Sequence, residues 1–325
     1  MTLTRRSFMV AAAAAATTLA TSARAEAQPF KTKLQKALLA QIADEATCER
    51  IAKAGFPGVE LMKKDVTIEE AQKGRKVAEK FGLKIHSFMG GWANFNNPDP
   101  VARQKSIDDV KRMIRLTAAY GADAMLLVPC RTDASPRPKP EQFKITFDEE
   151  MMRVLTVVEG DNEPYKKYIT EQNRASALTQ KAIAELLPVA KTEGVTLALE
   201  NVWNNLWITP DFAATFIRSF NDKFVRAYLD LGNYVRYAKT EDYLRAFGPL
   251  IVRLHIKDFL INRNKANDGD FVPIGKGSID WVSVRKVIDE INYSGWVSIE
   301  DVAGWNDAQH STIMDNFFAG KGATL

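Results

Sequence analysis

Four apolar segments of this sequence end in a carboxylate or an imidazole, the side chains that most often bind metals or transfer protons. The four residues are Glu200 in VTLALEN (195–201), Asp230 in VRAYLDLGN (225–233), His255 in IVRLHIKDF (251–259) and Glu300 in GWVSIED (295–301). Alternate side chains of a strand face opposite sides. In each segment the polar residue is in phase with a single face, so we expect all four on one side of the sheet.

Three carboxylates that converge in a low-dielectric site repel one another, and a buried charge without a partner costs several kcal/mol. A divalent cation removes that cost. Carboxylate oxygens with one imidazole suit Mn²⁺ best, with Mg²⁺ or Co²⁺ as alternatives. The structural alternative is that each acid is a helix cap or a salt-bridge partner. Four such side chains, in phase on consecutive strands, favour a single metal site instead. Its ligands would be Glu200, Asp230, His255 and Glu300.

The elements that must position these residues are short apolar runs that alternate with longer amphipathic stretches. The runs span residues 36–42, 58–62, 83–88, 124–129, 195–201, 225–233, 251–259 and 295–301. Such alternation forms right-handed βαβ units, and eight units over about 275 residues predict a single (β/α)₈ TIM barrel. Its active site would lie at the C-terminal ends of the strands. A doubly wound sheet is the alternative, but no glycine-rich phosphate loop follows the first run.

Two connections are long enough to lie over the C-terminal face of the barrel. Residues 130–170 are irregular and include RTDASPRPKP, which predicts a functional lid or an excursion over the mouth. Residues 260–279 form the second long loop at the same end.

The N-terminal segment has the features of an export signal. Arg5 and Arg6 precede an alanine-rich stretch that ends in the small-x-small sequence Ala23-Arg24-Ala25. This pattern predicts a twin-arginine signal peptide over residues 1–25, a catalytic domain over 26–325 and a periplasmic location. The apolar stretch is too short to remain as a stable membrane anchor. A mobile alanine-rich helix is the alternative.

Charge excludes one class of partner. Residues 26–325 contain 41 basic and 40 acidic side chains, so they carry no basic footprint for nucleic acid or anionic membranes.

Cys48 and Cys130 are expected to be buried free thiols, although an oxidising compartment would permit a disulfide. His310 is expected at the surface without a partner.

The segments ALEN, LDLGN, LHIKD, GKGSIDW and SIED resemble the xylose-isomerase-like barrels of the sugar isomerase/epimerase superfamily, over residues 36–301. The resemblance implies that Glu200, Asp230, His255 and Glu300 bind the metal and that Glu200 and Glu300 also act as catalytic acid and base. Asn233 stands where many ketose epimerases of this superfamily have a histidine, and no arginine occupies position 261. The implied chemistry is abstraction of an α-proton through a metal-stabilised enediolate.

Further candidates lie at other predicted strand ends and are assigned to substrate binding, together with Asn233. Lys257 shares the inward face of His255 and would hold a substrate oxygen or pair with a neighbouring carboxylate. His86 and Glu60 end the third and second runs, and each is either a hydroxyl-binding residue or a structural one. Trp92 and Trp203 follow strand ends, where they would stack on a sugar ring or pack a lid.

The predicted function is isomerisation or epimerisation of a keto-sugar or related polyol, which is unphosphorylated because phosphosugars are scarce outside the cytoplasm. The first alternative is a lyase or hydratase that acts on a 3-keto-glycoside or an inosose-like compound. The remaining alternatives are a non-catalytic sugar-binding barrel and a phosphodiesterase. The expected partner is a small carbohydrate, and a homo-oligomer is compatible with the sequence.

Overall fold

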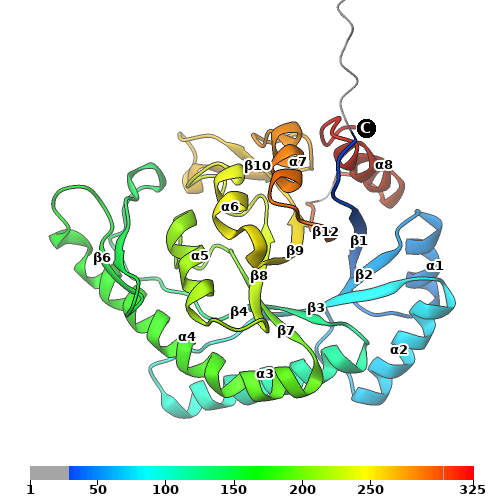
Figure 1. Ribbon diagram of the computed structural model, residues 1–325, viewed down its shortest axis with the longest axis horizontal. Coiled ribbons are helices and arrows are strands. Elements are labelled where there is room, and N and C mark those ends of the chain that lie inside the picture. Colours follow the sequence, from blue (N-terminus) through cyan, green and yellow to red (C-terminus); the bar gives the residue numbers. More distant parts are fainter. Residues whose placement is uncertain (1–28, 303) are drawn as a thin grey trace, which may run out of the picture.

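The computed structural model describes residues 29–302 and 304–325, and its centre is a closed barrel of parallel strands (Figure 1). Each strand pairs with its neighbours in the order β1-β12-β9-β8-β7-β4-β3-β2. The barrel strands are β1 (Leu34–Ala40), β2 (Gly58–Leu61), β3 (Lys84–Trp92), β4 (Ala124–Val128), β7 (Thr196–Glu200), β8 (Val225–Asp230), β9 (Ile251–Ile256) and β12 (Gly295–Ile299).

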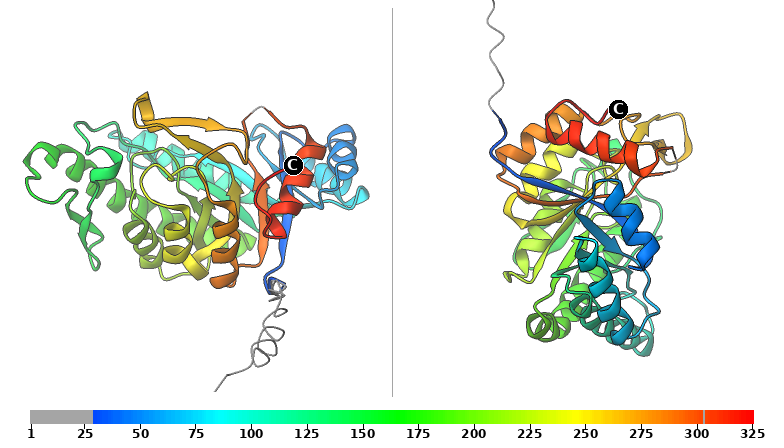
Figure 2. Two further views of the ribbon diagram at one scale, coloured as in Figure 1. Left: turned by 90° about the horizontal axis from the view of Figure 1, so that it is seen from above. Right: turned by 90° about the vertical axis from the view of Figure 1, so that its right-hand side faces the viewer.

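Helices surround the barrel and cover the outward faces of the strands (Figure 1, Figure 2). They are α1 (Glu45–Lys53), α2 (Ile68–Lys80), α3 (Pro100–Ala119), α4 (Lys166–Glu193), α5 (Pro210–Ser219), α6 (Thr240–Phe247), α7 (Trp281–Glu290) and α8 (Asp307–Phe318). Local sequence sets several of their ends. Thr67 and Glu70 form a reciprocal capping box at the start of α2, and Gly194 ends α4 in the left-handed conformation at φ 67°.

The expected barrel is confirmed, and each of the eight predicted runs overlaps one of its strands. The predicted end of the third run is wrong, because β3 continues to Trp92 and shifts its register with β4 between Met89 and Gly91. The predicted signal peptide, residues 1–25, lies outside the described residues. Among the residues that are described, no helix combines the length and the apolarity needed to cross a membrane.

The two long connections each contain an antiparallel hairpin. Strands β5 (Thr146–Asp148) and β6 (Arg153–Thr156) form the first, which projects from one end of the molecule (Figure 1). It is docked on α4 by hydrogen bonds between the Val154 backbone and Asn173. Strands β10 (Asp258–Ile261) and β11 (Gly269–Val272) form the second, directly after β9.

The loop from β11 to α7 is held by one buried carboxylate. Asp258 accepts hydrogen bonds from the N–H groups of Gly275 and Gly277, both at 2.9 Å, and from Trp281 Nε1 at 3.1 Å. A Cβ atom at Gly277 would lie 1.9 Å from Asp258 Oδ1, so this position requires glycine. Asp280 caps α7, where its side chain accepts the N–H of Ser283.

Both cysteines are buried free thiols, as expected. Burial raises the pKa of Cys48 to about 11 and that of Cys130 to about 12. The thiolate is the reactive form, so at pH 8 we expect the native protein to react with a disulfide reagent about 100-fold more slowly than the denatured chain. Equal rates in the two states, measured by absorbance, would contradict this burial.

Candidate metal centre

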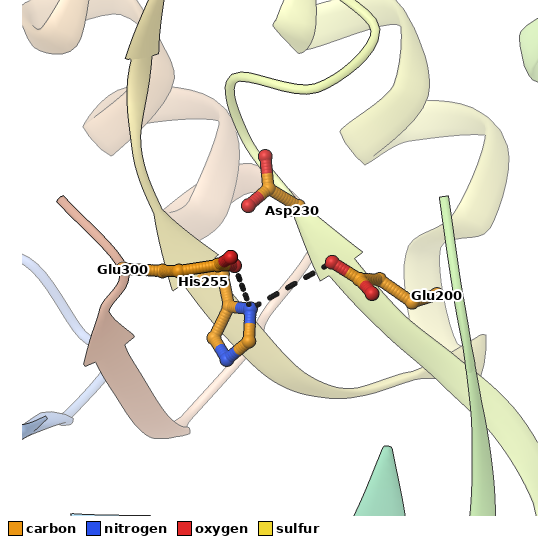
Figure 3. Close-up of side chains that lie close together, drawn as sticks. All are labelled: Glu200, Asp230, His255 and Glu300. Atoms are coloured by element: carbon orange, nitrogen blue, oxygen red, sulfur yellow. Dashed lines mark ion pairs between the residues drawn. The ribbon is translucent and has the colours of Figure 1, made fainter. Parts of the chain in front are cut away.

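The four predicted ligands come together at the C-terminal ends of four neighbouring barrel strands (Figure 3). Glu200 ends β7, Asp230 ends β8, His255 lies near the end of β9 and Glu300 directly follows β12. One donor atom from each of the four lies within 4.8 Å of every other. Parallel pairing explains part of this convergence, because the register of β8 and β9 sets Asp230 opposite His255.

Asp230 is held by backbone groups that leave one of its oxygens free. Its Oδ1 accepts the N–H groups of Gly232 at 2.8 Å and of Asn233 at 2.6 Å. Asn201 bonds to both backbone groups of Asp230, at 2.7 and 2.8 Å. A Cβ at Gly232 would lie 2.5 Å from the carbonyl oxygen of Lys257, so the LGN turn needs a glycine to bring β8 close to β9.

His255 is completely buried, and its two ring nitrogens have different surroundings. Nε2 lies 2.9 Å from Glu60 Oε2, on the side away from the other ligands. Nδ1 lies 2.9 Å from Glu300 Oε2 and 3.9 Å from Glu200 Oε1, as the dashed lines in Figure 3 show. The ring is therefore oriented with Nδ1 toward the carboxylates.

The donor atoms that face this centre fit a cation. Asp230 Oδ2, His255 Nδ1 and Glu300 Oε2 are buried, and among the described residues none has a hydrogen-bond partner outside this centre; Nδ1 and Oε2 face each other at 2.9 Å. Buried polar atoms are normally paired. Three such atoms that converge from three strands, two oxygens and one nitrogen, are the kind of set that a hard or borderline divalent ion prefers.

The electrostatics of the centre agree with that fit. Burial, together with the charges of Glu300 and Asp230, raises the pKa of Glu200 to about 7 against the opposing effect of His255. Burial lowers the pKa of His255, but four neighbouring side chains outweigh burial and raise that pKa: Tyr228, Glu60, Glu200 and Glu300. A cation bound here would therefore compete with protons for the same atoms.

Lys257 and Asn233 both contact the centre. Lys257 Nζ lies 2.8 Å from Glu300 Oε1 and 3.6 Å from Asp230 Oδ2. Lys257 therefore pairs with neighbouring carboxylates, which is the alternative to its binding a substrate oxygen. Burial raises the pKa of Glu300, but His255 and Lys257 outweigh burial and lower it to about 2. Asn233 donates from Nδ2 to Glu200 Oε1 at 3.2 Å and holds that carboxylate toward the centre.

His86 and Glu60, both predicted at strand ends, face the interior of the barrel. His86 is early in β3 and completely buried, with Nε2 2.9 Å from Ser298 Oγ. Burial and the charge of Arg253 hold the pKa of His86 well below its usual value. Glu60 is the penultimate residue of β2, is also completely buried and contacts His255.

The aromatic candidates differ in exposure. Trp92 is 47% exposed at the end of β3, beside a 580 Å³ groove that includes Arg131. Trp203 donates from Nε1 to the carbonyl of Asn233 at 2.5 Å and packs against Phe271, which ties the β10–β11 hairpin to the metal centre. The expectation for His310 is wrong, because it is buried and its Nε2 lies 3.0 Å from Asp301 Oδ2.

Sequence reasoning did not identify Asn201 or Tyr228 as part of this centre. Asn201 directly follows Glu200 in the ALEN segment and supports Asp230. Tyr228 is two residues before Asp230, so strand alternation places it on the same inward face. Its hydroxyl donates to Glu60 Oε2 at 2.5 Å.

Comparison with known proteins places the chain in a family. The model of the family described as xylose isomerase-like TIM barrel matches residues 48–313. The chain belongs to this xylose isomerase-like TIM barrel family. A protein of Methanocaldococcus jannaschii described as uncharacterized is 26% identical to this xylose isomerase-like barrel over 208 residues, 59% of this chain and 69% of that protein.

Solved structures share the fold of this xylose isomerase-like barrel at low sequence identity. A D-psicose 3-epimerase crystallised with D-fructose has a TM-score of 0.63 at 16% identity. The match covers 88% of this chain and 99% of the epimerase chain. The 3-keto-D-glucoside 4-epimerase YcjR of E. coli has a TM-score of 0.63 at 15% identity, covering 89% and 99%. The IolI protein with a bound zinc atom has a TM-score of 0.63 at 17% identity, covering 89% and 99%.

Proposed function

We propose that this protein is a metal-dependent isomerase or epimerase of a keto-sugar. The observation that carries the proposal is the convergence of Glu200, Asp230, His255 and Glu300 within 4.8 Å at the mouth of the barrel. Similarity to a D-psicose 3-epimerase and to a 3-keto-D-glucoside 4-epimerase supports sugar chemistry in such a barrel.

The four residues would hold one divalent ion, with Mn²⁺ expected before Mg²⁺ or Co²⁺ because three of the four donors are carboxylates. When bound, the ion supplies Lewis-acid polarisation of a substrate carbonyl and its neighbouring hydroxyl. Lys257 contributes a positive charge beside Glu300 and Asp230, which limits the repulsion between these two acids.

Glu200 and Glu300 are the proposed acid–base pair. One carboxylate removes the proton on the carbon next to the carbonyl, and the other returns a proton at the position that defines the product. Their surroundings separate their pKa values, about 7 for Glu200 and about 2 for Glu300, so the two groups differ in their readiness to hold a proton. Asn233 orients Glu200 through its amide.

We infer an unphosphorylated substrate from the twin-arginine pattern of residues 1–25, which predicts export to a compartment poor in phosphosugars. Lys257 is already paired with two carboxylates, so it is not a free cation for a phosphate group. A ketose, a keto-acid sugar or an oxidised glycoside fits these conditions.

Proton NMR in D₂O with a panel of ketoses and 3-keto-glycosides tests the proposal. With Mn²⁺-loaded enzyme as catalyst and the ion removed before the spectra are recorded, we expect one carbon-bound proton of the true substrate to be replaced by deuterium. The same spectra separate isomerase and epimerase outcomes from a lyase, because elimination releases a leaving group. No exchange with any member of the panel would contradict proton abstraction on this class of substrate.

A further inference from the structure

The interior of the barrel contains a connected set of polar side chains below the proposed metal centre. Barrel interiors are usually filled by layers of bulky apolar residues. Here the completely or almost completely buried interior residues include Glu60, His86, Tyr228, Arg253 and Ser298. Keeping these polar groups out of water is costly unless each is paired, so the set calls for an explanation.

The contacts form one chain from strand to strand across the interior. Arg253 Nε donates to His86 Nδ1 at 3.2 Å, so the His86 proton lies on Nε2, which is 2.9 Å from Ser298 Oγ. Ser298 Oγ lies 3.3 Å from the hydroxyl of Tyr228. Tyr228 donates to Glu60 Oε2 at 2.5 Å.

The chain ends on the imidazole of His255. Glu60 Oε2, which accepts from Tyr228, lies 2.9 Å from His255 Nε2. Two lone pairs at that distance would repel, so His255 carries a proton on Nε2 and donates it to Glu60. Nδ1 lies 2.9 Å from Glu300 Oε2, so without an ion it shares a proton with that carboxylate, and a bound cation would take the place of this proton. The bonds from Arg253 to Glu60 run in one direction and strengthen each other in a low dielectric, and His255 donates to Glu60 from the opposite side.

We propose that Glu60 is a positioning residue for the metal centre, held by Tyr228 and the chain behind it, and that it fixes the ring of His255 with Nδ1 toward the ion. Glu60 does not touch the other donors and is not a ligand. The inference rests on the proposed metal function of His255. It assigns Glu60, which the sequence suggested as a substrate contact, to the support of a ligand.

Glu60→Gln and Tyr228→Phe test the proposal, with Ser87→Ala as a matched control. Ser87 is a buried hydroxyl 3.4 Å from the same Tyr228 hydroxyl, and its loss leaves every link of the chain intact. Titration calorimetry of metal-stripped full-length protein with Co²⁺ measures the affinity. We expect Glu60→Gln to weaken binding about 10- to 100-fold, Tyr228→Phe about fivefold, and Ser87→Ala not at all.

A second readout separates positioning from general loss of structure. In the Zn²⁺-loaded protein, which is diamagnetic, the Nε2–H proton of His255 should resonate far downfield because it is bonded to a carboxylate. We expect this resonance to move upfield in Glu60→Gln while Tm without metal stays close to that of the wild type. If Glu60→Gln does not fold, Tyr228→Phe carries the same test.

Unchanged Co²⁺ affinity and an unmoved Nε2–H resonance in folded Glu60→Gln and Tyr228→Phe would overturn this inference and leave the metal centre intact. A wild-type protein that binds no ion in a one-to-one complex would overturn both the inference and the proposed function.

Discussion

Glu200→Gln is expected to lower kcat by about 10²–10⁴-fold, the usual contribution of a general acid or base. The glutamine amide has almost the same shape as the carboxylate. Its oxygen can still accept the hydrogen bond that Asn233 Nδ2 now donates to Glu200 Oε1 at 3.2 Å. It cannot take a proton from the substrate, so turnover is lost while the pocket keeps its form.

The measurement is steady-state turnover of the substrate found by deuterium exchange, with the metal content of each sample determined alongside because Glu200 is also a proposed ligand. Glu69→Gln, at an exposed position on α2, is the control and should keep wild-type turnover. A kcat for Glu200→Gln within about twofold of wild type would remove this residue from the acid–base pair.

Removal of the divalent ion is the second change with a large expected effect. Chelation should lower turnover by about 100-fold or more, because Lewis-acid stabilisation is worth several kcal/mol, and addition of Mn²⁺ should restore it. The ion binds only the folded chain, so at 100 times its Kd it should stabilise the protein by about 2.7 kcal/mol. Thermal unfolding measured with and without Mn²⁺ should show a higher Tm with the ion. Full activity in the stripped protein would contradict metal dependence.

The fold and the convergence of the four side chains could be predicted because each depends on local signals. Apolar runs separated by amphipathic stretches specify the repeated βα unit, and parallel pairing then brings equivalent strand ends to one edge. Alternation along a strand decides which side chains face inward, so Asp230 and His255 could be assigned from spacing alone. The same spacing assigns Glu200 and Glu300, and the family resemblance adds their catalytic role.

The errors arise where contacts across the barrel decide the outcome. Strand β3 continues to Trp92, six residues beyond His86, so His86 lies deep in the barrel instead of at its rim. No local pattern reveals that Glu60 meets His255, which is 195 residues away. His310 is buried because α8 packs it on Asp301, a contact that only the closed fold supplies.

Anomalous diffraction from crystals grown with Mn²⁺, recorded at the manganese absorption edge, tests the central claim most directly. We predict one strong peak about 2.0–2.4 Å from Asp230 Oδ2, His255 Nδ1 and a carboxylate oxygen of both Glu200 and Glu300. An anomalous difference map without a peak among these four side chains, from crystals grown at a manganese concentration that supports turnover, would contradict the proposed metal centre.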